Sequence, residues 1–380
     1  MDTSLMSQSA LIIPAYKPDD RLPPYVEALK QAGVGKIIIV DDGSGEEYKY
    51  LFEQIPQDEI TRLISYTPNR GKGVALRTAM QYLLDACPDQ RYIITADSDG
   101  QHTVPDVLRM IEALHENHEG LLLGSRDFST GNVPAKSLLG NRITSVVFKL
   151  LYGRWVGDTQ TGLRGFERSL LPTMAAVKGD RYEYEMNVLI ECASLKLPMR
   201  PLVIQTVYEN NNEGSHFRAF QDSFRIYGVI FAGFFRFISA SLAGFGVDYV
   251  LYLLLNNLFK AYVPALEHQF RFLFISVLSR IAVATIAARL ISGTLNFFLN
   301  QKVVFQYRGS AKRSLPRYIC VFLLIMLLSA GLTSSLHLWF GLSDNTIKIP
   351  VDVVLFFLSY YLQRKWVFPK ELLTEKIPQA

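Results

Sequence analysis

Short apolar runs alternate with amphipathic stretches along the first 220 residues. The apolar runs end in polar turns, and they read ALIIPAY, KIIIVDDGS, RYIITADSDG and GLLLGSR. Stretches with helical spacing lie between or after them, and they read PPYVEALKQAGV, GVALRTAMQYLLDAC and VPDVLRMIEALHEN. This alternation predicts a Rossmann-like α/β domain with a mostly parallel sheet between helices.

From about Ile226 onward, long apolar runs replace this pattern. Each run is close to the ~20 apolar residues that cross a bilayer. We therefore predict an all-α membrane domain with four helices, at about 233–258, 271–295, 317–340 and 347–363.

The stretch HFRAFQDSFRIYGVIF before the first span mixes aromatic and charged residues. It suits an amphipathic helix on the membrane surface over 216–232, or an ordinary linker helix. The expected domains are thus a soluble domain over 1–215, this juxtamembrane segment, and a transmembrane domain over 233–370.

Basic residues gather after the second and fourth predicted spans. They are Lys302, Arg308, Lys312, Arg313 and Arg317, then Arg364, Lys365 and Lys370. Basic loops face the cytosol, and no signal peptide is found at the start. The sequence predicts a multi-pass plasma-membrane protein with its soluble domain and C-terminus in the cytoplasm.

An internal echo lies within the membrane half. LNFFLNQKVVF (295–305) resembles LSYYLQRKWVF (358–368) at a constant offset. Two helical hairpins, each ending in an aromatic and basic foot, would explain it, and so would chance similarity. The ionisable residues Asp248, Arg280, Arg289 and Asp352 lie in or beside the spans. Such residues usually face a partner or a cavity, so either acid could pair with Arg280, or they could contact a lipid phosphate.

Composition narrows the function classes. The net charge is only +4, which gives no sign of a nucleic-acid binder. The three cysteines are scattered, so we expect reduced thiols, without a disulfide framework or a CxxC metal site. A homo-oligomer is possible, and the sequence does not decide it.

Two aspartates follow the third apolar run, in ADSDGQH. Side chains that alternate along an extended strand end share a side, so Asp97 and Asp99 can reach one point. Oxygen ligands at this spacing suit Mg²⁺ or Mn²⁺, and Gln101 can add a neutral oxygen. A solvated turn is the plainer explanation of such a pair.

Other polar clusters sit at the ends of neighbouring strands, where α/β sheets bind ligands. In VDDGS, Asp41 or Asp42 can accept hydrogen bonds from a ribose or base, or can simply form a turn. In NRGKG, Lys72 and backbone N–H groups can meet a diphosphate at a helix start. The spacing is not that of a Walker A loop, which argues against an ATPase.

Arg126 in GSR and Arg142 in GNR suggest a second, anionic substrate, although a lone arginine is more often part of a surface ion pair. Asp158 lies in the polar segment DTQTGLRGF, and Glu185 lies ahead of a predicted helix. An acid at a helix start can be only an N-terminal charge.

The motifs IPAYKP, VDDGS, NRGKG, ADSDGQH, GSR and DTQTGLRGF, in this order, resemble family 2 glycosyltransferases of the GT-A fold. The resemblance covers about residues 8–215 and is closest to the polyprenyl-phosphate sugar synthases, such as the dolichyl-phosphate mannose synthases. The membrane half resembles the GtrA-like four-span family, through its span count and its aromatic and basic feet.

This resemblance implies a role for each motif. Pro14, Ala15, Tyr16 and Asp42 would line the nucleotide pocket; Asp97, Asp99 and Gln101 would hold the metal; and Arg126 and Arg142 would grip the acceptor phosphate. Relatives often have Asn-Glu after the tyrosine, whereas Lys17-Pro18 follows here, so Asp19 or Asp20 would have to substitute. The QxxRW signature of processive synthases is absent, which argues against a polymer product.

The implied reaction transfers one hexose from a nucleotide-diphosphate sugar, with uridine favoured, to a polyprenyl phosphate of the undecaprenyl type. It would depend on Mg²⁺ or Mn²⁺, invert the anomeric carbon and be non-processive, with Asp158 and Glu185 orienting the sugar. Two alternatives remain open. One is a transporter or flippase of a lipid-linked sugar that the soluble half feeds, and the other is a nucleotidyltransferase.

Overall fold

The computed structural model describes residues 3–126, 135–205, 219–272, 275–307, 309–340 and 344–369. It divides into two compact units, the first running to Ile230 and the second from Phe231 to Lys370. The predicted boundary between residues 215 and 216 lies outside the described residues.

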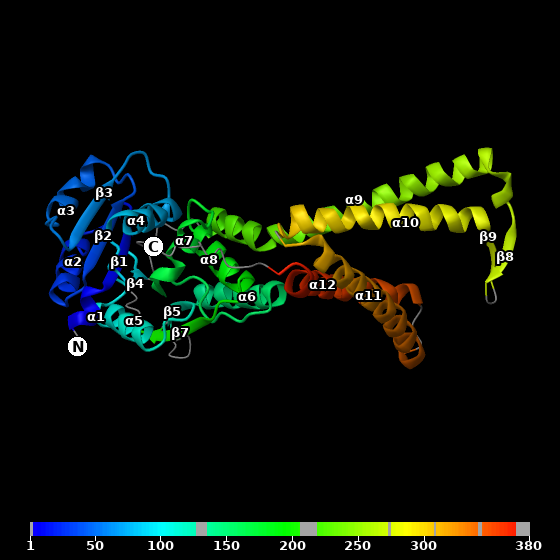
Figure 1. Cartoon of the computed structure of the whole chain (residues 1–380). Helices are drawn as coiled ribbons and strands as arrows, with labels where there is room; N and C mark the ends of the chain where they lie inside the picture. The colour runs from blue at the N-terminus through cyan, green and yellow to red at the C-terminus, as the bar shows by residue number, and fades with distance from the viewer. Residues whose placement is uncertain are drawn as a thin grey trace. The chain divides into compact units, whose positions relative to one another are not determined.

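A seven-stranded sheet forms the centre of the first unit (Figure 1). Its strands are β1 (Ser9–Ala15), β2 (Lys36–Asp41), β3 (Thr61–Ser65), β4 (Tyr92–Thr95), β5 (Leu121–Arg126), β6 (Arg164–Glu167) and β7 (Met199–Ile204). Their order is β3-β2-β1-β4-β6-β5-β7, and only β6 runs antiparallel to its neighbours. The predicted mostly parallel α/β sheet is confirmed.

Helices pack on this sheet. They are α1 (Thr3–Ser7), α2 (Leu22–Gln31), α3 (Lys49–Glu53), α4 (Lys72–Ala86), α5 (Val104–Glu116), α6 (Ala135–Tyr152), α7 (Leu171–Ala175) and α8 (Glu183–Ser194). Leu11 and Ile39 on one face join a buried core with residues of α2 and α5. Ile12 and Ile38 alternate to the other face and are equally buried, and α4 packs against β1 and β2. Burial on both faces explains the continuous apolar runs.

The strand register brings the polar clusters to one edge of the sheet. Ala15 at the end of β1 pairs with Asp41 at the end of β2, and Ile12 pairs with Thr95 at the end of β4. The parallel strands therefore present their carboxyl ends on the same side, as the sequence predicts.

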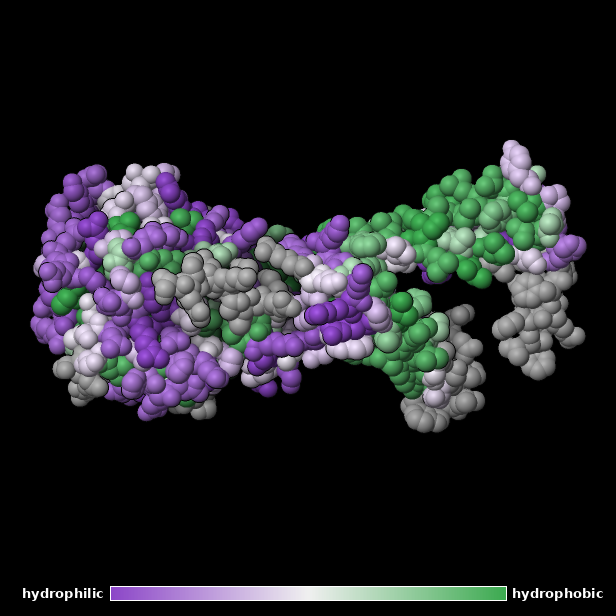
Figure 2. All heavy atoms as spheres, viewed as in Figure 1, coloured by the Kyte–Doolittle hydropathy of each residue, from purple (hydrophilic) through white to green (hydrophobic). Residues whose placement is uncertain are grey.

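The second unit is mainly helical. Helix α9 (Ala219–Tyr262) begins in the first unit and continues into the second, followed by α10 (Ser279–Leu299), α11 (Ala311–Phe340) and α12 (Asp344–Leu362). Among the described residues, Gln221–Tyr262 and Ser279–Val304 are long and apolar enough to cross a membrane. Figure 2 shows apolar side chains over much of α9 and α10.

Two features correct the predicted boundaries. The second span was expected from residue 271, but β8 (Gln269–Phe272) and β9 (Ile275–Leu278) form an antiparallel hairpin there, and α10 begins only at Ser279. Residues 219–232 of the expected juxtamembrane helix are the first turns of α9, without a break before the span.

The membrane-half charges pair differently from the expected partnership with Arg280. Asp248 accepts from Arg289 at 3.1 Å and from the Ser292 hydroxyl at 2.8 Å. Arg280 instead lies 2.8 Å from Glu267, an acid that the sequence did not indicate as its partner. These pairs link helices or flank the hairpin, which supports the structural explanation for them.

The two echoed segments contact each other directly. Helices α10 and α12 both end in π-helical turns, Asn300–Val304 and Gln363–Val367. The Asn300 side-chain amide donates to Gln363 Oε1 at 3.2 Å, across a separation of 63 residues. This separation is the offset of the sequence echo, so equivalent positions of the two segments meet.

The surrounding rings repeat the same relationship. Phe305 and Phe368, which are equivalent, stack with centroids 5.3 Å apart. Phe297 lies 5.8 Å from Phe368, and its equivalent Tyr360 lies 5.8 Å from Phe305. Reciprocal contacts of this kind are what a local two-fold axis produces. The echo therefore reflects a symmetric pairing of the ends of α10 and α12.

Candidate active site

Lys72, the first residue of α4, joins two carboxylates at the edge of the sheet. Its Nζ atom lies 2.5 Å from Asp97 Oδ1 and 2.8 Å from Glu185 Oε1. Asp97 follows β4, and Glu185 lies in the first turn of α8. Three elements that are distant in sequence therefore meet at one ammonium group.

A buried aspartate builds the turn that presents Lys72. The Asp42 carboxylate accepts from the backbone N–H groups of Arg70 and Gly71, each at 2.8 Å, and from the Asn69 side chain at 2.8 Å. Gly71 has φ +102°, which favours glycine. Both carboxylate oxygens of Asp42 therefore serve this turn. Asp41 makes a shorter turn of its own, accepting from Ser44 N at 2.9 Å.

Asp97 is surrounded by positive or donor groups. His102 Nε2 lies 3.3 Å from Asp97 Oδ2, opposite the contact with Lys72. Burial by itself would raise the pKa of Asp97, but Lys72 and His102 outweigh it and hold the pKa below its usual value. For Lys72 the balance is the mirror image: burial opposes the charge, but Asp97 and Glu185 raise its pKa. Both groups are therefore ionised at neutral pH.

Asp99 lies near enough to feel the charge of Asp97. Burial, followed by that negative charge, raises the pKa of Asp99 above its usual value. Asp99 Oδ1 also accepts from Gln101 N at 3.0 Å, so the predicted metal ligands form one tight turn. A pair of carboxylates whose ionisation is mutually opposed attracts a cation.

The oxygen atoms at this strand end are of the type that a divalent cation binds. Among the described residues, no group of three or more His, Cys, Asp or Glu side chains is arranged to hold a metal. The oxygens of Asp97, Asp99 and Gln101 are nevertheless the ligand type that Mg²⁺ and Mn²⁺ take, usually with water and phosphate completing the shell. Two buried polar atoms beside them, His102 Nδ1 and Tyr25 Oη, lack hydrogen-bond partners. Burial and the charges of Asp97 and Asp99 raise the pKa of Tyr25, which places its hydroxyl within their field.

The two predicted acceptor arginines lie in different surroundings. Arg126 ends β5 and forms a two-point ion pair with Asp158, with Nε at 2.7 Å and Nη2 at 2.9 Å. Arg142 is exposed on α6. The preceding residue, Asn141, binds the loop of Asp158, since its side chain donates to Gly157 O at 2.6 Å and accepts from Thr159 N at 2.9 Å.

The expected nucleotide end lies at the end of β1. Pro14 and Ala15 are buried in the strand, and Tyr16 follows it half-buried. Lys17 adopts φ +51° and donates its backbone N–H to Ser44 Oγ at 2.9 Å. Its ammonium lies 5.8 Å from the Tyr16 ring and 5.7 Å from the Tyr48 ring. Lys17 thus lies beside two aromatic rings just past the end of β1.

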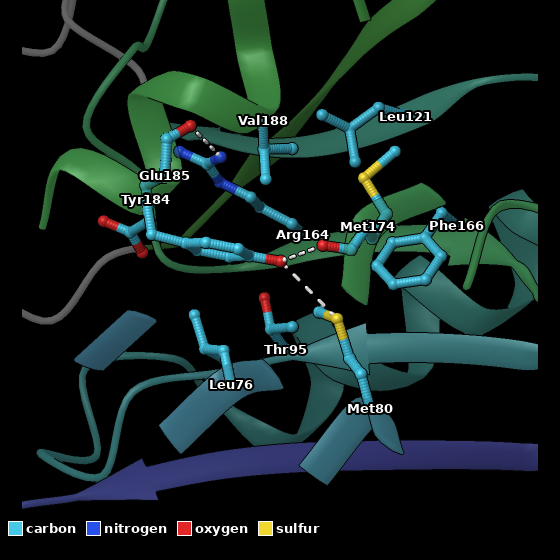
Figure 3. Close-up of a pocket in the computed structure, with 10 residues that line it drawn as sticks. All are labelled: Leu76, Met80, Thr95, Leu121, Arg164, Phe166, Met174, Tyr184, Glu185 and Val188. Atoms are coloured by element: carbon cyan, nitrogen blue, oxygen red, sulfur yellow. Dashed lines mark hydrogen bonds between the residues drawn. The ribbon is translucent and has the colours of Figure 1, made fainter. Parts of the chain in front are cut away.

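A small cavity lies behind Glu185 (Figure 3). Buried Arg164 points into it, donating to Glu185 O at 2.7 Å and to Thr161 O at 3.0 Å. Tyr184 closes the side near Met174, to whose carbonyl its hydroxyl donates at 2.9 Å. This apolar lining supports α8 from behind, so Arg164 positions the segment that carries Glu185.

Sequence reasoning missed four residues of this site. His102 belongs to the motif ADSDGQH. Its position shortly after two aspartates could have been used to predict that it lies beside them. Gly162 lies against Asp97, so that a Cβ at this position would collide with the Asp97 carboxylate. Arg164 and Tyr25 become neighbours of the site only through the fold, and no local pattern marks them.

A mostly parallel sheet with Asp97 just past the end of β4, to which α4 and α8 bring Lys72 and Glu185, has the architecture of the GT-A fold. Residues 10–173 match the profile of glycosyl transferase family 2, and residues 236–368 match that of the GtrA/DPMS transmembrane domain. The chain therefore carries a glycosyl transferase family 2 domain followed by a GtrA/DPMS transmembrane domain.

Curated relatives agree with this assignment. The chain is 29% identical over 217 residues to the UDP-N-acetylglucosamine–dolichyl-phosphate N-acetylglucosaminyltransferase of Methanococcus voltae, covering 52% of this chain and 85% of that protein. It is 24% identical over 182 residues to an undecaprenyl-phosphate 4-deoxy-4-formamido-L-arabinose transferase of Salmonella paratyphi B, covering 46% and 53% respectively. Among solved structures, glucosyl-3-phosphoglycerate synthase of Mycobacterium tuberculosis, in complex with Mn²⁺, uridine diphosphate and glucosyl-3-phosphoglycerate, aligns at 14% identity and a TM-score of 0.43, over 60% of this chain and 82% of that one.

Proposed function

We propose that the protein transfers one sugar from a nucleotide-diphosphate donor, UDP-linked by preference, to a polyprenyl phosphate. The observation that carries the proposal is the meeting of Lys72, Asp97 and Glu185 at the sheet edge of a family 2 domain. The attached GtrA/DPMS domain and the lipid-phosphate acceptors in the names of two relatives support a lipid acceptor. The relative that uses a UDP-sugar supports uridine.

Asp97, Asp99 and Gln101 would hold a Mg²⁺ or Mn²⁺ ion, which supplies Lewis-acid stabilisation of the departing diphosphate. Lys72 would donate to the same diphosphate as a point charge with three donors. Glu185, held on α8, would accept a hydrogen bond from a sugar hydroxyl. Inversion at the anomeric carbon follows if the acceptor oxygen attacks in line, opposite the leaving group.

The acceptor phosphate is largely ionised near neutral pH, so it needs positioning more than deprotonation. Arg126 and Arg142 would supply that positioning. Asp158 acts through Arg126, because its carboxylate is occupied by the Arg126 guanidinium and by Gln160 N at 3.2 Å. Asp158 is therefore a positioning residue in this proposal.

The basic residues of the membrane half suggest the orientation. Lys302 and Lys365 lie at equivalent positions in the two π-helical turns. Basic segments favour the cytoplasmic side. We propose that these turns and the catalytic unit face the cytoplasm, where nucleotide sugars are made.

The test is direct. Purified full-length protein in detergent is incubated with Mn²⁺, polyprenyl phosphate and a panel of nucleotide sugars labelled in the sugar. Lipid-extractable label that depends on both substrates supports the proposal. A parallel incubation supplies a sugar 1-phosphate and a nucleoside triphosphate. Release of pyrophosphate there, without lipid-linked label in the first reaction, would instead identify a nucleotidyltransferase.

A further inference from the structure

Lys72 occupies the position at which the strand-end carboxylates need a cation. Its side chain is only 17% exposed, and both of its carboxylate partners are also largely enclosed. Asp97 has one oxygen against Lys72 and the other against His102. A metal ligand of the proposed reaction is thus already neutralised by a side chain of the protein.

We propose that Lys72 is a resident counter-cation that exchanges partners during the binding of the donor. It neutralises Asp97 and Glu185 before a divalent cation binds, and it moves to the donor diphosphate when the divalent cation takes Asp97. This inference rests on the proposed function and assigns Lys72 a role in coupling the metal to the donor.

The physical reason is competition for one carboxylate. A divalent ion bound to Asp97 repels an ammonium group that shares the same oxygens, and this repulsion is strong where water is largely excluded. The lysine stem is flexible and its head is a compact point charge, so Lys72 can leave Asp97 without unfolding its helix. A diphosphate bound to the same cation offers new oxygens to the displaced ammonium.

Exchange of this kind predicts the direction in which Lys72 changes two affinities, that for the divalent cation and that for the diphosphate. Without nucleotide, Lys72 weakens the binding of a divalent cation, because it must be displaced. With nucleotide, Lys72 strengthens the binding of the diphosphate. The metal and the donor therefore assist each other's binding through Lys72, and the coupling is reciprocal. A residue that only supported the fold would weaken both bindings when replaced.

The experiment measures Mn²⁺ binding to full-length protein in detergent by the electron paramagnetic resonance signal of free Mn²⁺. We expect Lys72→Met to bind Mn²⁺ roughly tenfold more tightly than wild type without nucleotide, and to bind UDP roughly tenfold more weakly with Mn²⁺ present. Lys30→Met is the matched control, since it removes another lysine from an ion pair, the one with Asp58, and leaves the site intact. Equal or weaker Mn²⁺ binding by folded Lys72→Met would overturn the exchange.

A second variant keeps the test decisive if Lys72→Met fails to fold. Lys72→Gln keeps an amide donor toward Asp97 and Glu185 but removes the positive charge. We expect this variant also to bind Mn²⁺ more tightly without nucleotide, because no ammonium group has to leave Asp97. Equal or weaker Mn²⁺ binding by the folded variant would overturn the exchange.

The measurements distinguish a failure of the exchange at Lys72 from a failure of the proposed function. Asp97→Asn should lose Mn²⁺ binding in either case. Wild-type protein that makes lipid-linked sugar, together with unchanged Mn²⁺ affinity in Lys72→Met, refutes only the exchange. Tighter Mn²⁺ binding in Lys72→Met without lipid-linked product from any donor refutes the lipid acceptor and leaves the exchange supported.

Discussion

Arg126 and Asp158 form a buried two-point ion pair, with Arg126 Nε 2.7 Å from Asp158 Oδ2 and Nη2 2.9 Å from Oδ1. The Asp158 side chain has no exposed surface, and that of Arg126 is 15% exposed. The pair joins the end of β5 to the loop before β6, two segments 32 residues apart. Arg126 is therefore held in one direction at the edge of the sheet.

This pair makes a prediction about stability and acceptor binding. Asp158→Asn removes the charge opposite a buried guanidinium, so we expect a loss of about 3 kcal/mol in unfolding free energy. Replacing both partners, in Arg126→Met with Asp158→Leu, should restore much of that loss but not acceptor binding. Thermal unfolding of the detergent-solubilised protein and a polyprenyl-phosphate binding assay measure the two effects. Full stability of Asp158→Asn would show that the pair is not energetically coupled.

Removal of Asp99 should separate activity from folding. Asp99→Ala deletes one proposed ligand of the cation, and we expect a fall in kcat on the order of 10²–10³-fold. The variant should remain folded and in the membrane fraction, since the Asp99 carboxylate accepts from Gln101 N within its own turn. Asp89→Ala, at an exposed position in the turn before β4, is the control. Wild-type turnover by Asp99→Ala would reject this residue as a ligand.

Gly162 should be as important to Asp97 as its charged partners. A Cβ at Gly162 would collide with the Asp97 carboxylate, whereas a Cβ at Gly157 would meet only Ser125 Oγ at 3.9 Å. We expect Gly162→Ala to lower the Mn²⁺ affinity and activity at least tenfold, as do changes to residues that hold metal ligands in place. Gly157→Ala, in the same loop, should be close to wild type. Equal behaviour of the two variants would mean that the carboxylate moves aside freely.

The raised pKa of Asp99 predicts a pH dependence of stability without metal. The folded protein disfavours the ionised form relative to the unfolded chain, whose reference value is 3.8. The contribution of Asp99 to stability should therefore rise as the pH falls from neutral through the raised pKa, and this gain should be complete only below the unfolded-state value of 3.8. Asp99→Asn should melt at a higher temperature than wild type at pH 7, and the difference should shrink as the pH falls and vanish below that value. A lower melting temperature at pH 7 would contradict this sign.

The sequence was sufficient for the parts of the fold that have a clear period. Strands β1, β2, β4 and β5 follow from the apolar runs, because they are buried on both faces of the sheet. The helices between them follow from helical spacing, because one face of each is buried. The four-residue strand β6 was missed, since it is too short to show a period and only the fold inserts it between β4 and β5. The span predicted from residue 271 included the end of β8 (Gln269–Phe272) and all of β9 (Ile275–Leu278), because most residues there are apolar and composition does not distinguish a buried helix from a short strand pair.

The candidate site also contains some contacts that the sequence could predict and others that it could not. Proximity of Asp97 and Asp99 could be predicted, since it depends on adjacent positions at one strand end. The bridge from Lys72 to Glu185 could not, because it joins helices α4 and α8 through tertiary packing. Likewise, Asp42 binds a turn almost thirty residues away, at Gly71, and only the structure shows that its carboxylate is used there.

The symmetric contact of Asn300 with Gln363 gives a last prediction. Asn300 is fully buried and Gln363 nearly so, so losing either amide strands a polar partner, and Asn300→Ala should cost about 1 kcal/mol or more. Because the two residues occupy equivalent positions about a local two-fold axis, exchanging them conserves both the side-chain volume and the hydrogen bond. The double variant Asn300→Gln with Gln363→Asn should therefore unfold closer to wild type than either single exchange, measured by thermal unfolding in one detergent. If the double variant loses as much as the two single exchanges added together, the two positions are not equivalent and the local symmetry has no energetic meaning.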